Sequence, residues 1–379
     1  MLAMQRETSV SMSQRTTRAV GVAAALALLV GFPSAAQQPG AGPSVIDLMI
    51  QSRSQEQPQP SARHISLPAG NPLEVLHVHG QIYMIAGGPA NVAVQIGPEG
   101  VLLVDTATED LSEHLLQAVR VLSDGPISYI VNTTPDRSHY GGNAVLSAAG
   151  RNPTTAERDL TGHVAGLAAG DRRDDTPGGG PGAAMRPTGA IVFGHENVLL
   201  RMSAATEPFA LWPTSTFFTR LKTFSFNDEP IELLHQPAAH TDGDLMVFFR
   251  RSDVLAVGPL IDTLQYPVFD AARGGSMRGI LDGLNEIIRI TVPRFNQMAG
   301  TRVVPGRGRI LNEADVVEYR DMMTIVYERV RDAAKDGTSL AEITRMQPTL
   351  EYDPLYSVPG WTGEMLIEAI YEEVRRQGA

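Results

Sequence analysis

Four side chains of this sequence are candidates for catalysis or ligand binding: Asp136, His139, His240 and Arg307. Asp136 and His139 lie three residues apart in the polar segment 131–143, which follows an apolar run and ends in Gly-Gly-Asn. Imidazole and carboxylate groups can hold a metal ion or transfer protons, and a guanidinium group binds anions. The sequence therefore predicts a site for metal-assisted chemistry, acid–base chemistry or anion binding.

Two further carboxylates are expected to support this site. Asp105 ends the apolar run 100–104, and Asp244 follows His240 by four residues. We expect Asp105 to accept hydrogen bonds at the end of its strand and Asp244 to cap a turn that orients His240. Together with Arg307, both are candidate ligand-binding residues.

Alternating and helically spaced apolar residues predict the elements that must position these side chains. The predicted strands are Leu73–His79, Gln81–Ile85, Asn91–Ile96, Gly100–Asp105, Ile127–Val131, Ala190–Phe193, Phe217–Phe226, Ile231–Leu234, Leu245–Phe249, Val254–Val257 and Arg302–Pro305. The predicted helices are Glu109–Leu122, Ala144–Ala149, Glu196–Ala204, Met277–Ile290, Asn312–Lys335, Leu340–Met346 and Trp361–Arg376. Strands and a helix followed by strands and helices indicate an α+β fold in which helices enclose two packed sheets.

Composition and charge indicate a globular protein that binds a small molecule. With 43% hydrophobic and 19% charged residues, the chain is typical of a globular protein. A net charge of −11 argues against nonspecific binding to nucleic acid, and the absence of cysteine excludes disulfides and thiolate chemistry. The expected partner is a small-molecule ligand or substrate.

The domain boundaries follow from local composition. Residues 1–36 have a positive region at Arg15 and Arg18, an apolar run and a small-residue cleavage site, which predicts a secretory signal peptide and export to the periplasm or the extracellular space. An uncleaved anchor is the alternative; after cleavage we expect no stable membrane span. Residues 37–65 are predicted to be a flexible linker, 66–310 the main domain with an insertion at about 161–190, and 311–379 a C-terminal helical extension packed on it. The insertion is interpreted as a lid or a disordered segment.

Five segments, in order along residues 73–376, resemble those of the metallo-β-lactamase-fold hydrolases. They are Gly100–Thr106, Asn132–Asn143, Pro237–Asp244, Val254–Pro259 and Val303–Gly308. The resemblance implies a four-layer αβ/βα sandwich. It also implies metal-dependent hydrolysis of a small ester, amide, lactam or thioester, with two zinc ions at the site.

This chain departs from the metal ligands that the resemblance implies. By position, the first metal would use Thr134, Asp136 and His240, the second would use Ser138, His139 and Arg307, and Pro259 would replace the bridging carboxylate. Hydroxyl groups are poor zinc ligands, proline has no ligand atom, and arginine stays protonated. A full dinuclear zinc site is therefore not expected, and the cofactor is predicted to be none or one zinc ion.

Three interpretations of the remaining residues stay open. In the first, no metal binds, Arg307 supplies a fixed positive charge that pairs with Asp136 or an anion, and the protein is non-catalytic or weakly active and binds a small ligand. In the second, a single metal on Asp136, His139 and His240 supports hydrolysis. In the third, His139 or His240 works with Asp136 as a metal-free acid–base pair. A structural or partner-binding role of the C-terminal helices is a further hypothesis.

Overall fold

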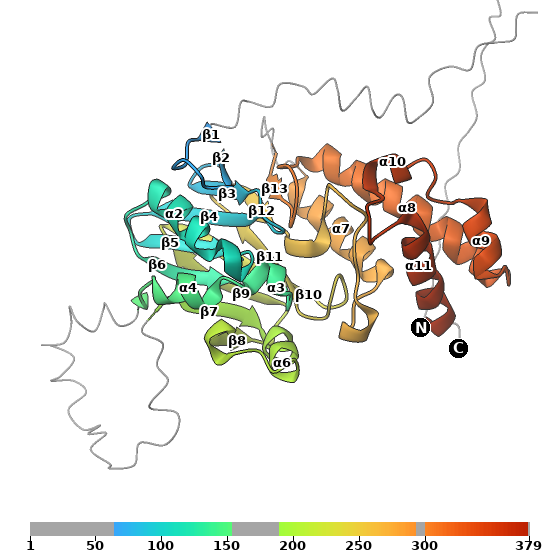
Figure 1. Ribbon diagram of the computed structural model, residues 1–379, viewed down its shortest axis with the longest axis horizontal. Coiled ribbons are helices and arrows are strands. Elements are labelled where there is room, and N and C mark those ends of the chain that lie inside the picture. Colours follow the sequence, from blue (N-terminus) through green and yellow to red (C-terminus); the bar gives the residue numbers. More distant parts are fainter. Residues whose placement is uncertain (1–63, 154–188, 293–299, 378–379) are drawn as a thin grey trace, which may run out of the picture. The chain divides into compact units, whose positions relative to one another are not determined.

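The computed structural model describes residues 64–153, 189–292 and 300–377, which all belong to one compact unit, 45–379 (Figure 1). The predicted signal peptide, nearly all of the predicted linker and most of the predicted insertion lie outside the described residues. The last two residues of the predicted linker differ from expectation, because β1 (His64–Ile65) pairs with the next strand. No helix among the described residues has the length and apolarity needed to cross a membrane.

The first sheet contains eight strands in the order of the sequence. After β1 come β2 (Glu74–His79), β3 (Ile82–Ala86), β4 (Val92–Gly97), β5 (Gly100–Val104), β6 (Ile127–Val131), β7 (Ile191–His195) and β8 (Ser215–Phe217). Strands β1 to β5 pair antiparallel, and β5 to β8 pair parallel. Because the carboxyl ends of parallel strands share one edge of a sheet, the loops after β5, β6 and β7 lie together.

The second sheet contains five strands in the order β13-β12-β11-β10-β9. They are β9 (Leu221–Phe226), β10 (Glu229–Gln236), β11 (Asp244–Phe249), β12 (Val254–Ala256) and β13 (Arg302–Val304). The predicted single strand Phe217–Phe226 is wrong, because residues 218–220 separate β8 in the first sheet from β9 in the second. A continuous run of alternating side chains does not reveal where a chain crosses from one sheet to another.

Helices cover the outer face of each sheet, which makes the four layers that the sequence predicts. On the first sheet lie α2 (Ser112–Leu122), preceded by η1 (Glu109–Leu111), and α4 (Asn143–Ala148); on the second lies α7 (Met277–Thr291). The remaining short elements are α3 (Arg137–Tyr140), α6 (Glu196–Ala204), η2 (Phe209–Leu211), η3 (Gly258–Leu260) and η4 (Ala271–Arg273). The α+β sandwich is thus confirmed.

Strand β5 is apolar at consecutive positions because both faces of its sheet are covered. Leu102 and Val104 pack between the two sheets, whereas Val101 and Leu103 pack under the helices on the outer face. Both faces of the sheet are therefore buried, and no position of the strand is left for a polar side chain.

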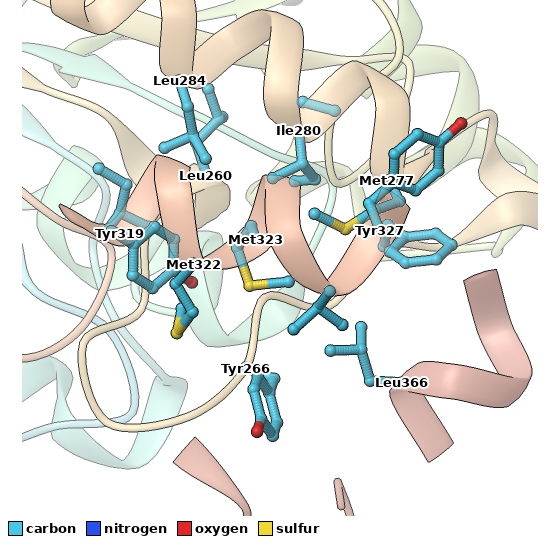
Figure 2. Packing of buried hydrophobic residues seen from close by; sticks show 14 of the residues in the cluster. Leu260, Tyr266, Met277, Ile280, Leu284, Tyr319, Met322, Met323, Tyr327 and Leu366 are labelled. Atoms are coloured by element: carbon cyan, nitrogen blue, oxygen red, sulfur yellow. The ribbon is translucent and has the colours of Figure 1, made fainter. Parts of the chain in front are cut away.

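The C-terminal helices extend the outer layer around α7. They are α8 (Glu313–Lys335), α9 (Leu340–Met346), α10 (Asp353–Tyr356) and α11 (Gly363–Gln377). Their apolar faces form one buried cluster with Met277, Ile280 and Leu284 of α7 (Figure 2). The buried Glu373 of α11 also accepts a hydrogen bond from the Met277 amide at the start of α7, where a helix favours a negative charge.

Candidate functional site at the ends of the strands

A pair of asparagines closes the segment 131–143, which leaves the end of β6. Asn143 Nδ2 donates to Asn132 Oδ1 at 2.8 Å, and Asn132 Nδ2 donates to Asn143 Oδ1 at 3.1 Å. At Gly142 a Cβ would collide with the carbonyl oxygen of Thr106, so only glycine fits. These contacts fix the loop on which Thr134, Asp136 and His139 stand.

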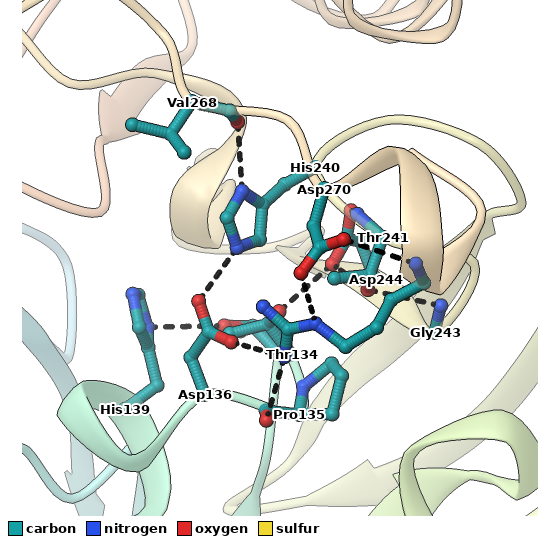
Figure 3. A network of polar contacts seen from close by, with 12 residues as sticks. Thr134, Pro135, Asp136, His139, His240, Thr241, Gly243, Asp244, Val268 and Asp270 are labelled. Atoms are coloured by element: carbon teal, nitrogen blue, oxygen red, sulfur yellow. Dashed lines mark hydrogen bonds and ion pairs between the residues drawn. The ribbon is translucent and has the colours of Figure 1, made fainter. Parts of the chain in front are cut away.

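Asp136 joins two cations from distant parts of the chain (Figure 3). Its Oδ2 accepts a hydrogen bond from His240 Nε2 at 2.6 Å, and its Oδ1 accepts one from Arg273 Nη1 at 2.5 Å. The other ring nitrogen of His240, Nδ1, lies 2.7 Å from the Val268 carbonyl oxygen, which can only accept. Both ring nitrogens therefore donate, and His240 is an imidazolium.

The pKa values of His240 and Asp136 agree with a charged imidazolium–carboxylate pair. Burial by itself would lower the pKa of His240, but the hydrogen bond to Asp136 and the charges of Asp244 and Asp136 outweigh it and raise the pKa to about 9. Burial would likewise raise the pKa of Asp136, but His240 and Arg273 hold it well below its usual range. At neutral pH the site thus holds a carboxylate between two positive charges.

Arg273 and its partner Asp270 are part of the site that sequence reasoning missed. Arg273 Nε donates to Asp270 Oδ2 at 2.7 Å, and Nη1 also donates to the Pro135 carbonyl oxygen at 3.1 Å. The stretch Asp-Ala-Ala-Arg-Gly has the sequence signal of a capped turn, and Asp270 does cap η4. That signal could locate a turn, but not its contact with Asp136 on the other half of the chain.

Asp244 connects the loop after β6 to the loop before β11. It accepts hydrogen bonds from Thr134 Oγ1 at 2.9 Å, from the Thr241 amide at 2.6 Å and from Thr241 Oγ1 at 2.7 Å. Burial raises the pKa of Asp244 against these hydrogen bonds and the charge of His240. The expectation that Asp244 contacts a ligand is corrected, because its side chain is fully enclosed and its oxygens are already used.

His139 faces a different carboxylate from the one predicted. Its Nδ1 donates to Asp105 Oδ2 at 2.7 Å, whereas Asp136 is bonded to His240 and Arg273. Asp105 also accepts from the Thr133 amide at 2.8 Å and from Thr133 Oγ1 at 2.6 Å. Asp105 is itself only 2% exposed, so it can act on a ligand only through His139.

Arg307 does not form the predicted pair with Asp136, because Arg273 occupies that place. The Arg307 side chain is half-buried, and its guanidinium has no hydrogen bond or ion pair with any residue that the structure describes. Burial raises the pKa of Asp262, against the hydrogen bond from the Leu264 amide and the charge of Arg307, and the backbones of Arg307 and Asp262 pair in an isolated parallel bridge. Arg307 therefore lies beside Asp262.

These residues do not fit a metal ion. His240 offers no lone pair, both oxygens of Asp136 contact cations, and the hydroxyl of Thr134 bonds to Asp244. Within residues 64–153, 189–292 and 300–377, no three His, Asp or Glu side chains are arranged to hold a metal. The structure brings Asp136 and His240 together but leaves His139 with Asp105, so the predicted three-residue metal set is not assembled.

Comparison with known proteins supports the architecture. The model of the metallo-beta-lactamase superfamily matches residues 85–299, which is more than half of the chain. No curated protein matches in sequence.

Three solved structures are similar to the chain. The stereoselective inverting sec-alkylsulfatase Pisa1 from Pseudomonas sp. has a TM-score of 0.51 at 14% identity, covering 79% of this chain and 50% of that chain. A double mutant of the sec-alkyl sulfatase PisA1 has a TM-score of 0.52 with the same identity and coverage. A metallo-beta-lactamase from Pontibacter korlensis has a TM-score of 0.47 at 15% identity, covering 66% of this chain and 99% of that one. The chain thus spans half the length of the alkylsulfatases, whose likeness concerns the fold.

Proposed function

This chain belongs to the metallo-beta-lactamase superfamily, and we propose that it binds a small anionic molecule at the strand ends without a metal ion. The observation that supports the proposal is that cations stand where the family holds metal ions. His240 and Arg273 share Asp136 in one half of the site, and Arg307 lies beside Asp262 in the other half. A guanidinium group provides a fixed positive charge and several donors for carboxylate or phosphate oxygens.

The free hydrogen-bond donors favour Arg307 as the anion contact. His240 and Arg273 already donate to Asp136 and Asp270. The guanidinium of Arg307 has no such carboxylate contact among the described residues, and it keeps donors for a ligand. The alternative function, a mononuclear metal-dependent hydrolase of a small ester, amide, lactam or thioester, would require His240 to lose its proton and release Asp136.

Metal content and anion binding test the proposal together. Elemental analysis of the purified protein is expected to find far less than one zinc ion per chain. Thermal shift and calorimetry with acetate, glutarate and phenyl phosphate are expected to show stabilisation by at least one anion, because a ligand that binds only the folded state raises the melting temperature.

Matched variants make this experiment specific. Arg307→Gln should abolish the stabilisation, whereas Arg302→Gln, which removes another half-buried arginine at the start of β13, should keep it. Stoichiometric zinc that is lost on His139→Ala or His240→Ala would overturn the proposal in favour of the mononuclear hydrolase. A lack of response to all three anions would also overturn it.

A further inference from the structure

We infer that His139, oriented by Asp105, is a metal-independent general base that hydrolyses a small ester carrying an anionic group. The inference rests on the proposed anion site and adds a reaction to it. The pairing of His139 with Asp105 at 2.7 Å, with the opposite ring nitrogen unbonded, carries the inference.

The hydrogen bond to Asp105 determines which nitrogen of His139 can accept a proton. A carboxylate only accepts, so Nδ1 carries the hydrogen, and the lone pair of the neutral ring is on Nε2. Nε2 has no hydrogen-bond partner among the described residues, and it is not one of their fully enclosed polar atoms that lack a partner. His139 therefore presents a basic nitrogen that retains contact with solvent.

Several contacts hold this dyad in place. The Thr106 amide donates to the His139 carbonyl oxygen at 2.7 Å, which ties the loop after β5 to helix α3. Asp105 has a positive φ of 66°, a conformation uncommon for a residue with a side chain. This backbone turn lets Asp105 meet both Thr133 and His139, and strained residues of this kind are found at functional sites.

His240 cannot take the same role. Both of its nitrogens donate, to Val268 and to Asp136, so it has no lone pair for a proton. The hypothesis of an acid–base pair made with Asp136 is therefore replaced by one made with Asp105. Arg307 supplies the substrate preference, because it is the anion contact of the proposed function and its guanidinium has no hydrogen bond or ion pair with the described residues.

The reaction needs only water as co-reactant. Nε2 of His139 takes a proton from water while the water oxygen bonds to the ester carbonyl carbon. The imidazolium, stabilised by Asp105, then returns that proton to the leaving oxygen as the carbon–oxygen bond breaks. The products are a carboxylic acid and an alcohol, and His139 is neutral again.

Two chromogenic esters test the inference on the full chain after treatment with a chelator. Mono-4-nitrophenyl glutarate carries an anionic group, and 4-nitrophenyl butyrate does not. We expect the anionic ester to be the better substrate, and Arg307→Gln to lower its kcat/KM at least tenfold while the neutral ester changes little. His139→Gln should lower kcat by about 10² to 10⁴-fold, the usual contribution of a general base.

Asp105 is a positioning residue, so its test must separate kcat from KM. Asp105→Asn keeps an oxygen for the Thr133 amide and tolerates a positive φ, but its NH2 group cannot accept the Nδ1 hydrogen of His139 as a carboxylate oxygen does. We expect kcat to fall at least tenfold with KM and anion binding unchanged. His77→Gln, on β2, should hydrolyse both esters like the parent protein and so excludes general surface imidazole reactivity.

The outcomes separate the inference from the proposed function. If the protein binds glutarate but His139→Gln hydrolyses the esters as fast as the parent, the inference fails and the anion site stands. Hydrolysis that appears only after zinc is added would overturn both. Circular dichroism of each variant, matched to the parent, excludes misfolding as the cause of a loss.

Discussion

The two histidines of the site have opposite hydrogen-bonding states, although both lie against a carboxylate within 2.7 Å. His240 donates from both nitrogens, to Val268 and Asp136, and is closed to further chemistry. His139 donates from one nitrogen and keeps the other unbonded among the described residues. The difference shows that a carboxylate neighbour does not by itself define the role of a histidine; the group at its second nitrogen does.

The two halves of the site therefore serve different ends. Around His240, each charge of Asp136, Arg273 and Asp270 has an opposite charge beside it, which favours stability. Around His139, a ring nitrogen and the guanidinium of Arg307 have no partner among the described residues, which favours function over stability.

Removal of the shared carboxylate should have the largest effect on stability. Asp136→Ala leaves His240 and Arg273 without their common partner, and the loss of one member of a buried ion pair costs about 3–5 kcal/mol in the free energy of unfolding. Urea denaturation at neutral pH measures this loss of stability. The matched variant Asp270→Ala removes the more exposed partner of Arg273 together with the cap of η4 and should cost about 1–2 kcal/mol. Equal losses in the two variants would contradict the contrast.

Alkaline pH should remove part of the same stabilisation. The folded-state pKa of His240 is raised from 6.5 to about 9, so its contribution is fully present below pH 6.5 and is lost as the pH rises through 9. At about 1.4 kcal/mol per pKa unit, the free energy of unfolding should fall by about 3 kcal/mol between pH 6 and 9.5. Asp136→Asn should lack most of this dependence. An identical pH dependence in parent and variant would show that other groups cause it.

Changes in the His139 half should cost the least stability. His139→Gln removes the hydrogen bond to Asp105, whose carboxylate keeps its bonds from Thr133, so we expect a loss of about 1 kcal/mol. Urea denaturation of His139→Gln and Asp136→Ala under the same conditions compares their losses in the free energy of unfolding. A loss as large as that of Asp136→Ala would assign His139 to the stabilising part of the site.

The periodic elements could be predicted because each is a local property. The predicted segments at 127–131, 196–204 and 340–346 coincide with β6, α6 and α9. The run 217–226 was divided between two sheets, because alternation of side chains is the same on either side of a crossover. The short helix α3 inside the loop was also not foreseen, since its four residues carry no apolar period.

Part of the site could be identified from the sequence: a loop that resembles the family's and keeps Asn132, Asn143 and its glycines, with Thr134, Ser138 and Arg307 at positions where the resemblance implies metal ligands. The pairing of the side chains depends on the folded chain. Folding placed Arg273, far along the chain, on Asp136, and it turned His139 to Asp105. The reason is physical: hydrogen bonds and ion pairs act over about 3 Å, and the distance between residues far apart in sequence depends on how the whole chain packs.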